Sequence, residues 1–273
     1  MTYRRRENWK RFPELKRLKD LSTPPKEIYY TGNWNPEIFK KCVAVVGSRR
    51  MSEYGRRVIE KIIPQLVLQK KTIISGFMYG IDQYTHQICV ESGGKTIAVL
   101  GWGINVKLDG YDKKLANKIV ESGGLIISEW EEQQAAHWTF PARNRIVAAL
   151  SSEIIIVEAA MKSGSLITAR IGNRLKRKIW AVPGPITSRT SAGTNLLIAQ
   201  NKAQMWIDSF LTSEKITTGD PLLDLLSNEA LTTNEIARKI NIPVSEIGAQ
   251  LSLLTISGQL TEREGKYYLN NAG

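Results

Sequence analysis

The stretch HWTFPARNRIVAALSSEIIIVEAAMKSGSLIT, residues 137–168, decides the fold. A helical pattern that follows Phe140 leads into the apolar run 154–157, which indicates a buried strand. Glu158 ends that run, and a turn with Ser163, Gly164 and Ser165 precedes the next helical pattern. Polar residues at the carboxyl end of an apolar strand, on a loop that leads into a helix, are typical of ligand sites in open α/β sheets.

The same unit of apolar run, small-residue turn and helical pattern recurs along the chain. The apolar runs are residues 43–46, 72–74, 96–100, 125–127, 154–157 and 179–182. Runs that are apolar on both faces and alternate with helices predict a parallel sheet with helices on both sides. We therefore expect an α/β fold with a Rossmann-like sheet of about six core strands, whose order does not follow from the sequence. Pro64 lies inside the helical pattern 55–68 and is expected to kink or end that helix.

Composition predicts four segments. Residues 1–41 are expected to be a short basic extension, either an arm on a phosphate backbone or a solvated terminus. Residues 42–210 are the predicted Rossmann-like domain, and residues 211–220 are a predicted linker. In residues 221–273, three helical patterns and a hairpin with its turn at Glu264-Gly265 predict a winged-helix domain. Its third helical pattern has no Lys or Arg, which favours packing or protein contact over DNA reading.

The charge is unevenly distributed. The chain of 273 residues has a net charge of +12, from 38 basic and 26 acidic residues. From Glu214 onward there are 5 basic and 8 acidic residues, so residues 1–213 hold 33 basic and 18 acidic ones. A basic main domain suggests a polyanionic partner, although general solubility would also account for the charge.

Several function classes are disfavoured. No apolar run approaches the ~20 residues that span a bilayer, and the N-terminal pattern is not that of a secretory signal, so we expect no membrane partner. Cys42 and Cys89 lack metal or redox spacing and fit a reducing cytoplasm, and two histidines argue against a metal centre. Gly94-Lys95-Thr96 lacks the leading glycine of a P-loop, and Gly101-Trp102-Gly103 lacks a third glycine. We expect neither an ATPase nor a dehydrogenase, and no cofactor.

The turns after the predicted strands must meet at one edge of a parallel sheet. Small residues there let backbone N–H groups approach a ligand, and helix N-termini favour phosphate. The candidate binding residues are Gly47, Ser48, Arg49, Ser75, Gly76, Phe140, Arg143, Asn144, Arg145, Ser163, Gly164, Ser165 and Thr168.

Each candidate also has a structural interpretation. Arg49 would hold a phosphate or be a plain surface residue, and Phe140 would stack a base or pack in the core. Arg143 and Arg145 cannot share a helix face, so one of them is expected to meet the ligand and the other to anchor Glu129 or Glu158. Asn144 would form a hydrogen bond with a base or cap the helix.

Catalytic arrangements are weak in this sequence. Asp82 and His86 lie at i and i+4, which would suit an acid–base pair, but a helix-starting Asp with an orienting His is the favoured interpretation. We find no convincing nucleophile with its base, so the predicted site binds rather than catalyses.

At these residues the sequence resembles the DNA-processing protein A (DprA/Smf) family. The resemblance rests on VAVVGSRRMSEYG (43–55), IISGFMYGID (73–82), GGKTIAVLGWG (93–103), GGLIISE (123–129), FPARNRIVAALS (140–151), IIIVEAAMKSGSLITA (154–169) and WAVPGPI (180–186). The tail resembles the winged-helix domain of many members. The segment before the Rossmann-like domain is shorter than in many members, and KLDGYD stands where the family's Tyr-Pro pair is expected.

The resemblance implies a cytoplasmic homodimer that binds single-stranded DNA (ssDNA) without cutting it. It implies that the protein protects the strand and loads the RecA recombinase onto it, in DNA uptake, natural transformation and recombination. By resemblance, the strand lies in the pocket that the candidate residues form.

Two other functions remain as alternatives. The first is a LOG-type phosphoribohydrolase that cleaves nucleoside monophosphates. That class has an acid after its PGGxGT turn, whereas here the corresponding stretch is SGSLIT and Arg170 stands two residues after Thr168. The second is a sequence-specific regulator that reads DNA with the winged helix.

Overall fold

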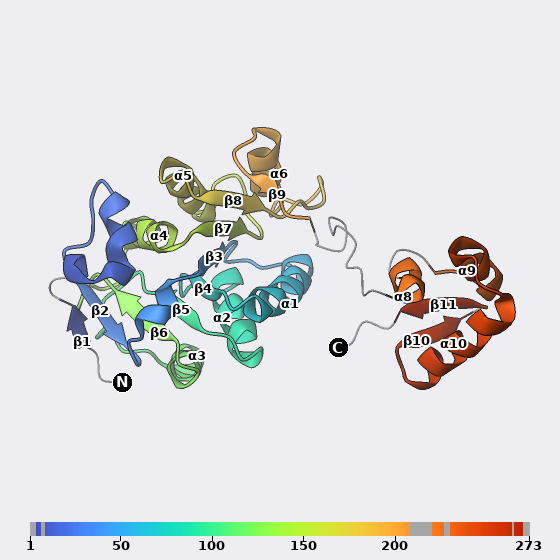
Figure 1. Ribbon diagram of the computed structural model, residues 1–273. Coiled ribbons are helices and arrows are strands. Elements are labelled where there is room, and N and C mark those ends of the chain that lie inside the picture. Colours follow the sequence, from blue (N-terminus) through green and yellow to red (C-terminus); the bar gives the residue numbers. More distant parts are fainter. Residues whose placement is uncertain (1–3, 7–8, 208–219, 227–229, 264, 270–273) are drawn as a thin grey trace. The chain divides into compact units, whose positions relative to one another are not determined.

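The structure, a computed structural model, describes residues 4–6, 9–207, 220–226, 230–263 and 265–269. The chain divides into two compact units, residues 1–206 and residues 207–273 (Figure 1). Most of the predicted linker, residues 211–219, lies outside the described residues.

The first unit is built on one mixed, mostly parallel sheet with the strand order β1-β2-β6-β5-β4-β3-β7-β8-β9. The strands are β1 (Arg4–Arg6), β2 (Ile28–Thr31), β3 (Cys42–Val46), β4 (Thr72–Ser75), β5 (Thr96–Val99), β6 (Leu125–Ser128), β7 (Glu153–Ile156), β8 (Lys178–Ala181) and β9 (Gln204–Met205). All pairs from β6 to β9 are parallel, while β2 pairs antiparallel with β6 and β1 pairs antiparallel with β2. The predicted parallel α/β sheet is thus confirmed, and two antiparallel strands extend it.

Helices cover both faces of this sheet (Figure 1). They are α1 (Glu53–Leu68), α2 (Ile81–Glu91), α3 (Gly110–Glu121), α4 (Thr139–Leu150), α5 (Ser165–Arg174) and α6 (Ala192–Ala199), with 3-10 helices η1 (Trp9–Arg11), η2 (Pro13–Asp20) and η3 (Pro36–Phe39). Because side chains alternate along a strand, Cys42 and Ala44 of β3 face the core under α4, whereas Val43 and Val45 face the core under α1. Burial on both faces explains why the strand runs are wholly apolar.

The N-terminal segment is part of the first unit, which corrects the prediction of a separate basic extension. Leu15 and Leu18 of η2 are fully buried, and the indole of Trp9 donates a hydrogen bond of 2.8 Å to the Pro25 carbonyl. Arg17 donates to the Leu150 carbonyl at the end of α4. Apolar residues placed among the basic ones therefore dock this segment on the sheet.

Helix α1 does not end at Pro64 but continues to Leu68, so of the two predicted effects the ending is wrong and the kink stays a prediction. Proline removes one backbone hydrogen bond from a helix interior. Ile59, Ile63 and Leu66 of the same helix are buried against β3 and β4. Their burial stabilises the helix on both sides of Pro64.

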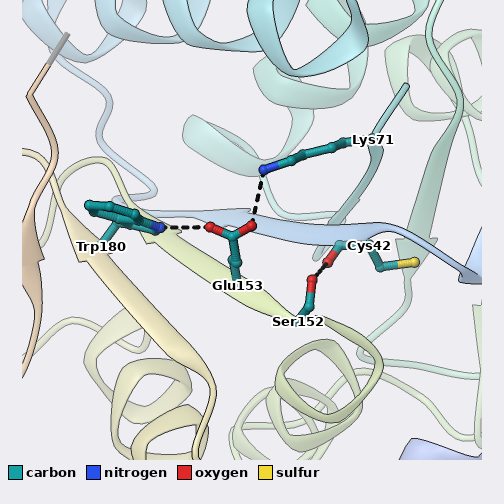
Figure 2. Close-up of polar contacts among 5 residues, drawn as sticks. All are labelled: Cys42, Lys71, Ser152, Glu153 and Trp180. Carbon is teal, nitrogen blue, oxygen red and sulfur yellow. Dashed lines mark hydrogen bonds and ion pairs between the residues drawn. The ribbon is translucent and has the colours of Figure 1, made fainter. Parts of the chain in front are cut away.

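A polar cluster lies at the amino end of β7 (Figure 2). Glu153 accepts hydrogen bonds from Lys71 at 3.0 Å and from the Trp180 indole at 2.9 Å. Burial opposes ionisation, but these two donors hold the pKa of Glu153 below its ordinary value. Ser152 donates to the Cys42 carbonyl at 2.9 Å. These contacts link β3, β7 and β8 at the end of the sheet opposite the carboxyl ends of the strands, where the predicted site lies.

In the part of the second unit that the structure describes, there are three helices and a hairpin, in the predicted order. They are α8 (Pro221–Leu226), α9 (Thr233–Ile240), α10 (Val244–Ile256), β10 (Leu260–Arg263) and β11 (Lys266–Leu269). Thr232 and Glu235 form a capping box at the start of α9. Ile236, Ile247 and Leu251 are buried in a small core of its own. Among the described residues of both units, no helix is both long and apolar enough to cross a bilayer.

Candidate functional site

The order in which the strands are added to the sheet reverses at β3, and this switch point determines where a ligand site can form. The chain adds β4, β5 and β6 on one side of β3, then returns through α4 to place β7 on the other side. The loops after β3 and β7 therefore leave the sheet next to each other. In open α/β sheets, ligands bind at such a switch point, outside the carboxyl ends of the strands.

A cleft of about 640 Å³ opens at this point, which is within the usual range for ligand sites. Its lining comes from the end of β3, from five loops and from the N-terminal parts of α2, α4 and α5. The lining residues are Val46, Gly47, Ser48, Arg49, Arg50, Gly76, Met78, Tyr79, Asp82, His137, Phe140, Pro141, Arg143, Asn144, Ala160, Lys162, Ser163, Gly164, Ser165, Thr168, Arg189 and Thr190. All but two of the predicted site residues are among them.

The cleft is lined by exposed cations. Arg49 and Arg50 follow β3, Lys162 follows β7, and Arg189 follows β8, and all four side chains are exposed. Asp82 is the acidic residue of the lining and is half-buried. Converging cations with a single acid favour an anionic ligand.

Arg49 lies against two aromatic rings. Its guanidinium carbon is 4.8 Å from the ring centroid of Phe140 and 6.0 Å from that of Tyr79. Phe140 is half-buried and packs on Trp102, with ring centroids 6.4 Å apart. The aromatic contacts orient a guanidinium that solvent and a ligand can still reach.

Arg143 lies in the floor of the cleft, and its interactions are mainly internal. Its side chain is 2% exposed, and it donates to the Val99 carbonyl and, at 3.2 Å, to Asn144 Oδ1. Burial lowers the pKa of Arg143 to about 10, and the nearby charge of Asp82 opposes that shift. The guanidinium therefore stays charged at neutral pH but has little surface to offer a ligand.

Asp82 is held beside Arg143 under the loops after β3 and β4. Burial raises the pKa of Asp82, while the charge of Arg143 and the backbone N–H groups of Met78 and Gly47 oppose the rise. A Cβ atom on Gly76 would lie 2.2 Å from Asp82 Oδ2 and 2.6 Å from Arg143 Nη1. Only glycine at position 76 lets these two side chains share that space.

His86 is fully buried behind the cleft. Its Nε2 lies 2.6 Å from the Gly76 carbonyl, which can only accept, so Nε2 carries the proton. Burial lowers the pKa of His86 to about 4, which keeps the ring neutral. This geometry matches the orienting role favoured from the sequence rather than that of an acid–base partner.

The turn before α5 forms one side of the cleft. Ser163 Oγ lies 2.8 Å from Ser165 Oγ, and the Asn144 amide nitrogen donates to the Gly164 carbonyl at 3.2 Å. Asn144 thus uses both its amide oxygen and its amide nitrogen within the protein. Gly164 remains exposed, so a ligand can approach the first backbone N–H groups of α5.

Glu158 connects the loops after β3 and β8 through hydrogen bonds that its carboxylate accepts. It is 1% exposed and accepts hydrogen bonds of 3.0 Å from the Ser52 N–H and from Thr190 Oγ1. The Ser52 hydroxyl also donates to it. Glu158 is therefore a scaffold residue, and neither arginine of α4 pairs with it among the described contacts.

Two predicted site residues differ from the prediction because they do not line the cleft. Ser75 is fully buried and donates a hydrogen bond of 2.6 Å to the Val45 carbonyl. Arg145 pairs with the carboxylate of Glu129. Arg145 is thus the anchoring member of the arginine pair, one of the two roles anticipated from their spacing.

Sequence reasoning missed Arg50, Tyr79, Lys162 and Arg189. Tyr79 and Lys162 lie within a few residues of a strand end, so the rule that found Gly47 and Ser163 would have found them too. Arg189 lies farther along the loop after β8, and only the fold brings it to the cleft. Among the described residues, no cluster of three or more His, Cys, Asp or Glu side chains could hold a metal ion.

Fold and site together define a Rossmann-like α/β protein with a cationic, partly aromatic cleft at its switch point. The chain belongs to the family described as DNA recombination-mediator protein A, which matches residues 6–216. The resemblance to the DprA/Smf family is thereby confirmed.

Relatives and solved structures agree with this family. Protein Smf of Escherichia coli is 33% identical over 249 residues, covering 82% of this chain and 67% of the relative. The DNA processing protein DprA of Streptococcus pneumoniae is 39% identical over 184 residues, covering 67% of this chain and 64% of the relative. This chain thus spans about two thirds of the length of each.

Two solved structures share the fold. The S. pneumoniae DprA structure has a TM-score of 0.67 at 36% identity, covering 76% of this chain and 71% of that one. The Helicobacter pylori DprA structure, whose subject is the protein's single-stranded DNA binding mode, has a TM-score of 0.66 at 28% identity. That likeness covers 75% of this chain and 91% of the H. pylori chain.

Proposed function

We propose that this chain binds single-stranded DNA in the cleft without cutting it. The observation that carries the proposal is the exposed guanidinium of Arg49, held over Phe140 at the switch point and accompanied by Lys162 and Arg189. Cations would contact phosphates, and aromatic rings would contact unpaired bases. The single-stranded DNA binding mode described for the H. pylori relative supports the same ligand class.

Single strands suit this cleft better than duplexes. Stacking on an aromatic side chain requires a base whose face is free, and a base inside a duplex offers none. Several residues that line the cleft have a small side chain or none, so the backbone of a DNA strand can come close to the protein backbone there. They are Gly47, Ser48, Gly76 and Gly164.

A binding role also fits the site better than phosphoribohydrolase chemistry. The two side chains that could act as acid and base, Asp82 and His86, are engaged by backbone groups of the protein. Arg170 is exposed and basic where the hydrolase class needs an acid. We propose a non-enzymatic protein that protects ssDNA and loads the RecA recombinase in the cytoplasm, during natural transformation and recombination.

We further propose that the chain acts as a homodimer and that its second unit is a winged-helix domain. Leu196 of α6 and Met205 of β9 are exposed by 36% and 44% and support self-association at this edge of the sheet. Leu253 and Ile256 of α10 are exposed, and α10 has no cation. This composition favours a protein-contact role for α10 over DNA reading.

Fluorescence anisotropy with labelled single- and double-stranded oligonucleotides, at several salt concentrations, tests the proposal. We expect tighter binding of the single strand, with an affinity that falls as salt rises because phosphate contacts release counterions. Equal affinity for both DNA forms, or no binding at low salt, would overturn it. Release of free base from a nucleoside monophosphate would instead support the hydrolase alternative.

A truncated chain of residues 1–206 tests the role of the second unit. The first unit has its own cores, so it should fold alone and keep most of its affinity for single strands. Loss of all DNA binding in a folded truncation would favour a regulator that reads DNA with its C-terminal unit.

A further inference from the structure

Tyr79 is a large aromatic side chain that the fold leaves open to solvent within the cleft. It lies in the loop between β4 and α2, lines the cleft, and is 56% exposed. Aromatic side chains are usually buried, so an exposed ring inside a cationic cleft is suited to contact a ligand.

The loop that carries Tyr79 is fixed against the loop that carries Arg49. The Ile81 N–H donates to the Ser48 carbonyl at 3.1 Å. Gly80 has a φ of +86°, and a Cβ atom there would lie 2.5 Å from the Ser48 oxygen and 2.6 Å from the Arg49 oxygen. The two backbones therefore touch, and Tyr79 has a defined place beside Arg49.

Phe140, the base-stacking candidate from the sequence, is less available than Tyr79. The Arg49 guanidinium lies over its ring at 4.8 Å, and Trp102 packs against it. A Cβ atom on Gly101 would lie 2.7 Å from Phe140 Cδ1, which shows how closely the ring sits on that backbone. Phe140 thus packs closely against Arg49 and Trp102, whereas Tyr79, which lies farther from Arg49, is 56% exposed.

We propose that Tyr79 is the stacking platform of the cleft and contacts one unpaired nucleobase while Arg49 holds an adjacent phosphate. The proposal rests on the proposed binding of single-stranded DNA and identifies the side chain that recognises the base. The 6.0 Å between the Arg49 guanidinium and the Tyr79 ring suits neighbouring contacts to one nucleotide. Recognition through a ring face tolerates any base, because every base has a π-face.

The experiment measures the affinity of the full chain for a labelled oligothymidylate by anisotropy. Tyr79→Ala should weaken binding about tenfold, within the range of base–aromatic stacking, and Tyr79→Phe should bind like the wild type. Tyr111→Ala is the matched control, because Tyr111 is 51% exposed on α3 and does not line the cleft. An oligonucleotide of abasic sites should bind the wild type and Tyr79→Ala with equal affinity.

A fluorescent base gives a second readout that needs no comparison of affinities. The fluorescence of 2-aminopurine in the bound strand should be quenched in the wild type and in Tyr79→Phe, and quenched less in Tyr79→Ala.

Failure of this inference is distinguishable from failure of the proposed function. If the wild type binds single strands and Tyr79→Ala binds them equally well, the stacking role is overturned and the binding function stands. If the wild type binds no single-stranded DNA, both are overturned.

Discussion

The guanidinium carbon of Arg49 lies 4.8 Å from the ring centroid of Phe140. The charge comes from the loop after β3 and the ring from the start of α4, and both line the cleft. This contact orders a long side chain that is otherwise exposed, so less conformational entropy is lost when a phosphate binds. Arg49 is therefore the cation of the cleft that is best prepared for a ligand.

Replacing Arg49 should weaken ssDNA binding more than removing a charge elsewhere. Arg49→Ala should lower affinity and reduce the salt slope by about 1, because one phosphate contact is lost. Arg49→Lys should recover only part of the affinity, since an ammonium lacks the planar stacking surface. Arg57→Ala, at an exposed arginine of α1 outside the cleft, is the control for anisotropy titrations. Equal losses in Arg49→Ala and Arg57→Ala would contradict this role.

Arg143 should matter more for stability than for direct binding. Arg143→Ala removes the hydrogen bond to the Val99 carbonyl and the counter-charge of Asp82. Losing one partner of a buried charged pair costs about 3 kcal/mol, which urea denaturation can measure. Arg174→Ala, at an exposed arginine of α5, should change the unfolding free energy by less than about 0.5 kcal/mol. If Arg143→Ala lowered the free energy of unfolding by less than about 1 kcal/mol, the floor of the cleft would not depend on Arg143 for its stability.

Gly80 should be far less tolerant of a side chain than Gly93. Both have positive φ angles, +86° and +73°, but a Cβ atom on Gly93 meets nothing within 4 Å. Gly93→Ala should therefore cost only the backbone strain, about 1–2 kcal/mol. Gly80→Ala adds a clash with the Ser48 and Arg49 backbone, so it should lose more stability in thermal unfolding and weaken ssDNA binding. Similar unfolding free energies for the two variants would be evidence against the fixed contact between these loops.

His86 should make the protein less stable as the pH falls from about 6.5 to about 4. The pKa of His86 in the folded protein, about 4, lies below the ordinary histidine value of 6.5 because of burial. In this window the unfolded chain binds a proton that the folded chain does not, so the free energy of unfolding falls with pH, by up to about 3 kcal/mol. In His86→Asn, the change in unfolding free energy between pH 7 and pH 4.5 should be smaller. An equal change in both proteins would refute the buried neutral imidazole.

The sequence predicted those parts of the site that depend on local order along the chain. Apolar runs followed by small residues located the loop at Gly47–Arg49 and the turn at Ser163–Ser165, because parallel strands place such loops on one edge. The spacing of Arg143 and Arg145 predicted that one of them would anchor Glu129 or Glu158, and Arg145 pairs with Glu129. That the other arginine meets the ligand stays a prediction. These inferences needed only strand direction and helix periodicity.

Other features depend on contacts between distant segments and could not be predicted. Arg17 meets the Leu150 carbonyl 133 residues away, so nothing local indicated that the basic N-terminal segment would join the sheet. Arg143 and Asp82 lie together beside Gly76, and the sequence spacing does not encode this contact. Arg189 reaches the cleft only because β8 lies beside β7.

The central claim is that the cleft, rather than the general positive charge of the chain, binds the unpaired strand. The most direct measurement compares the ssDNA affinity of two triple variants that lose equal charge. One is Arg49→Ala/Lys162→Ala/Arg189→Ala in the cleft, and the other is Arg57→Ala/Lys113→Ala/Arg174→Ala at exposed sites outside it. We expect the cleft variant to lose at least about a hundredfold in affinity at low salt and the control to lose less than about tenfold. Equal losses in the two variants would contradict the claim.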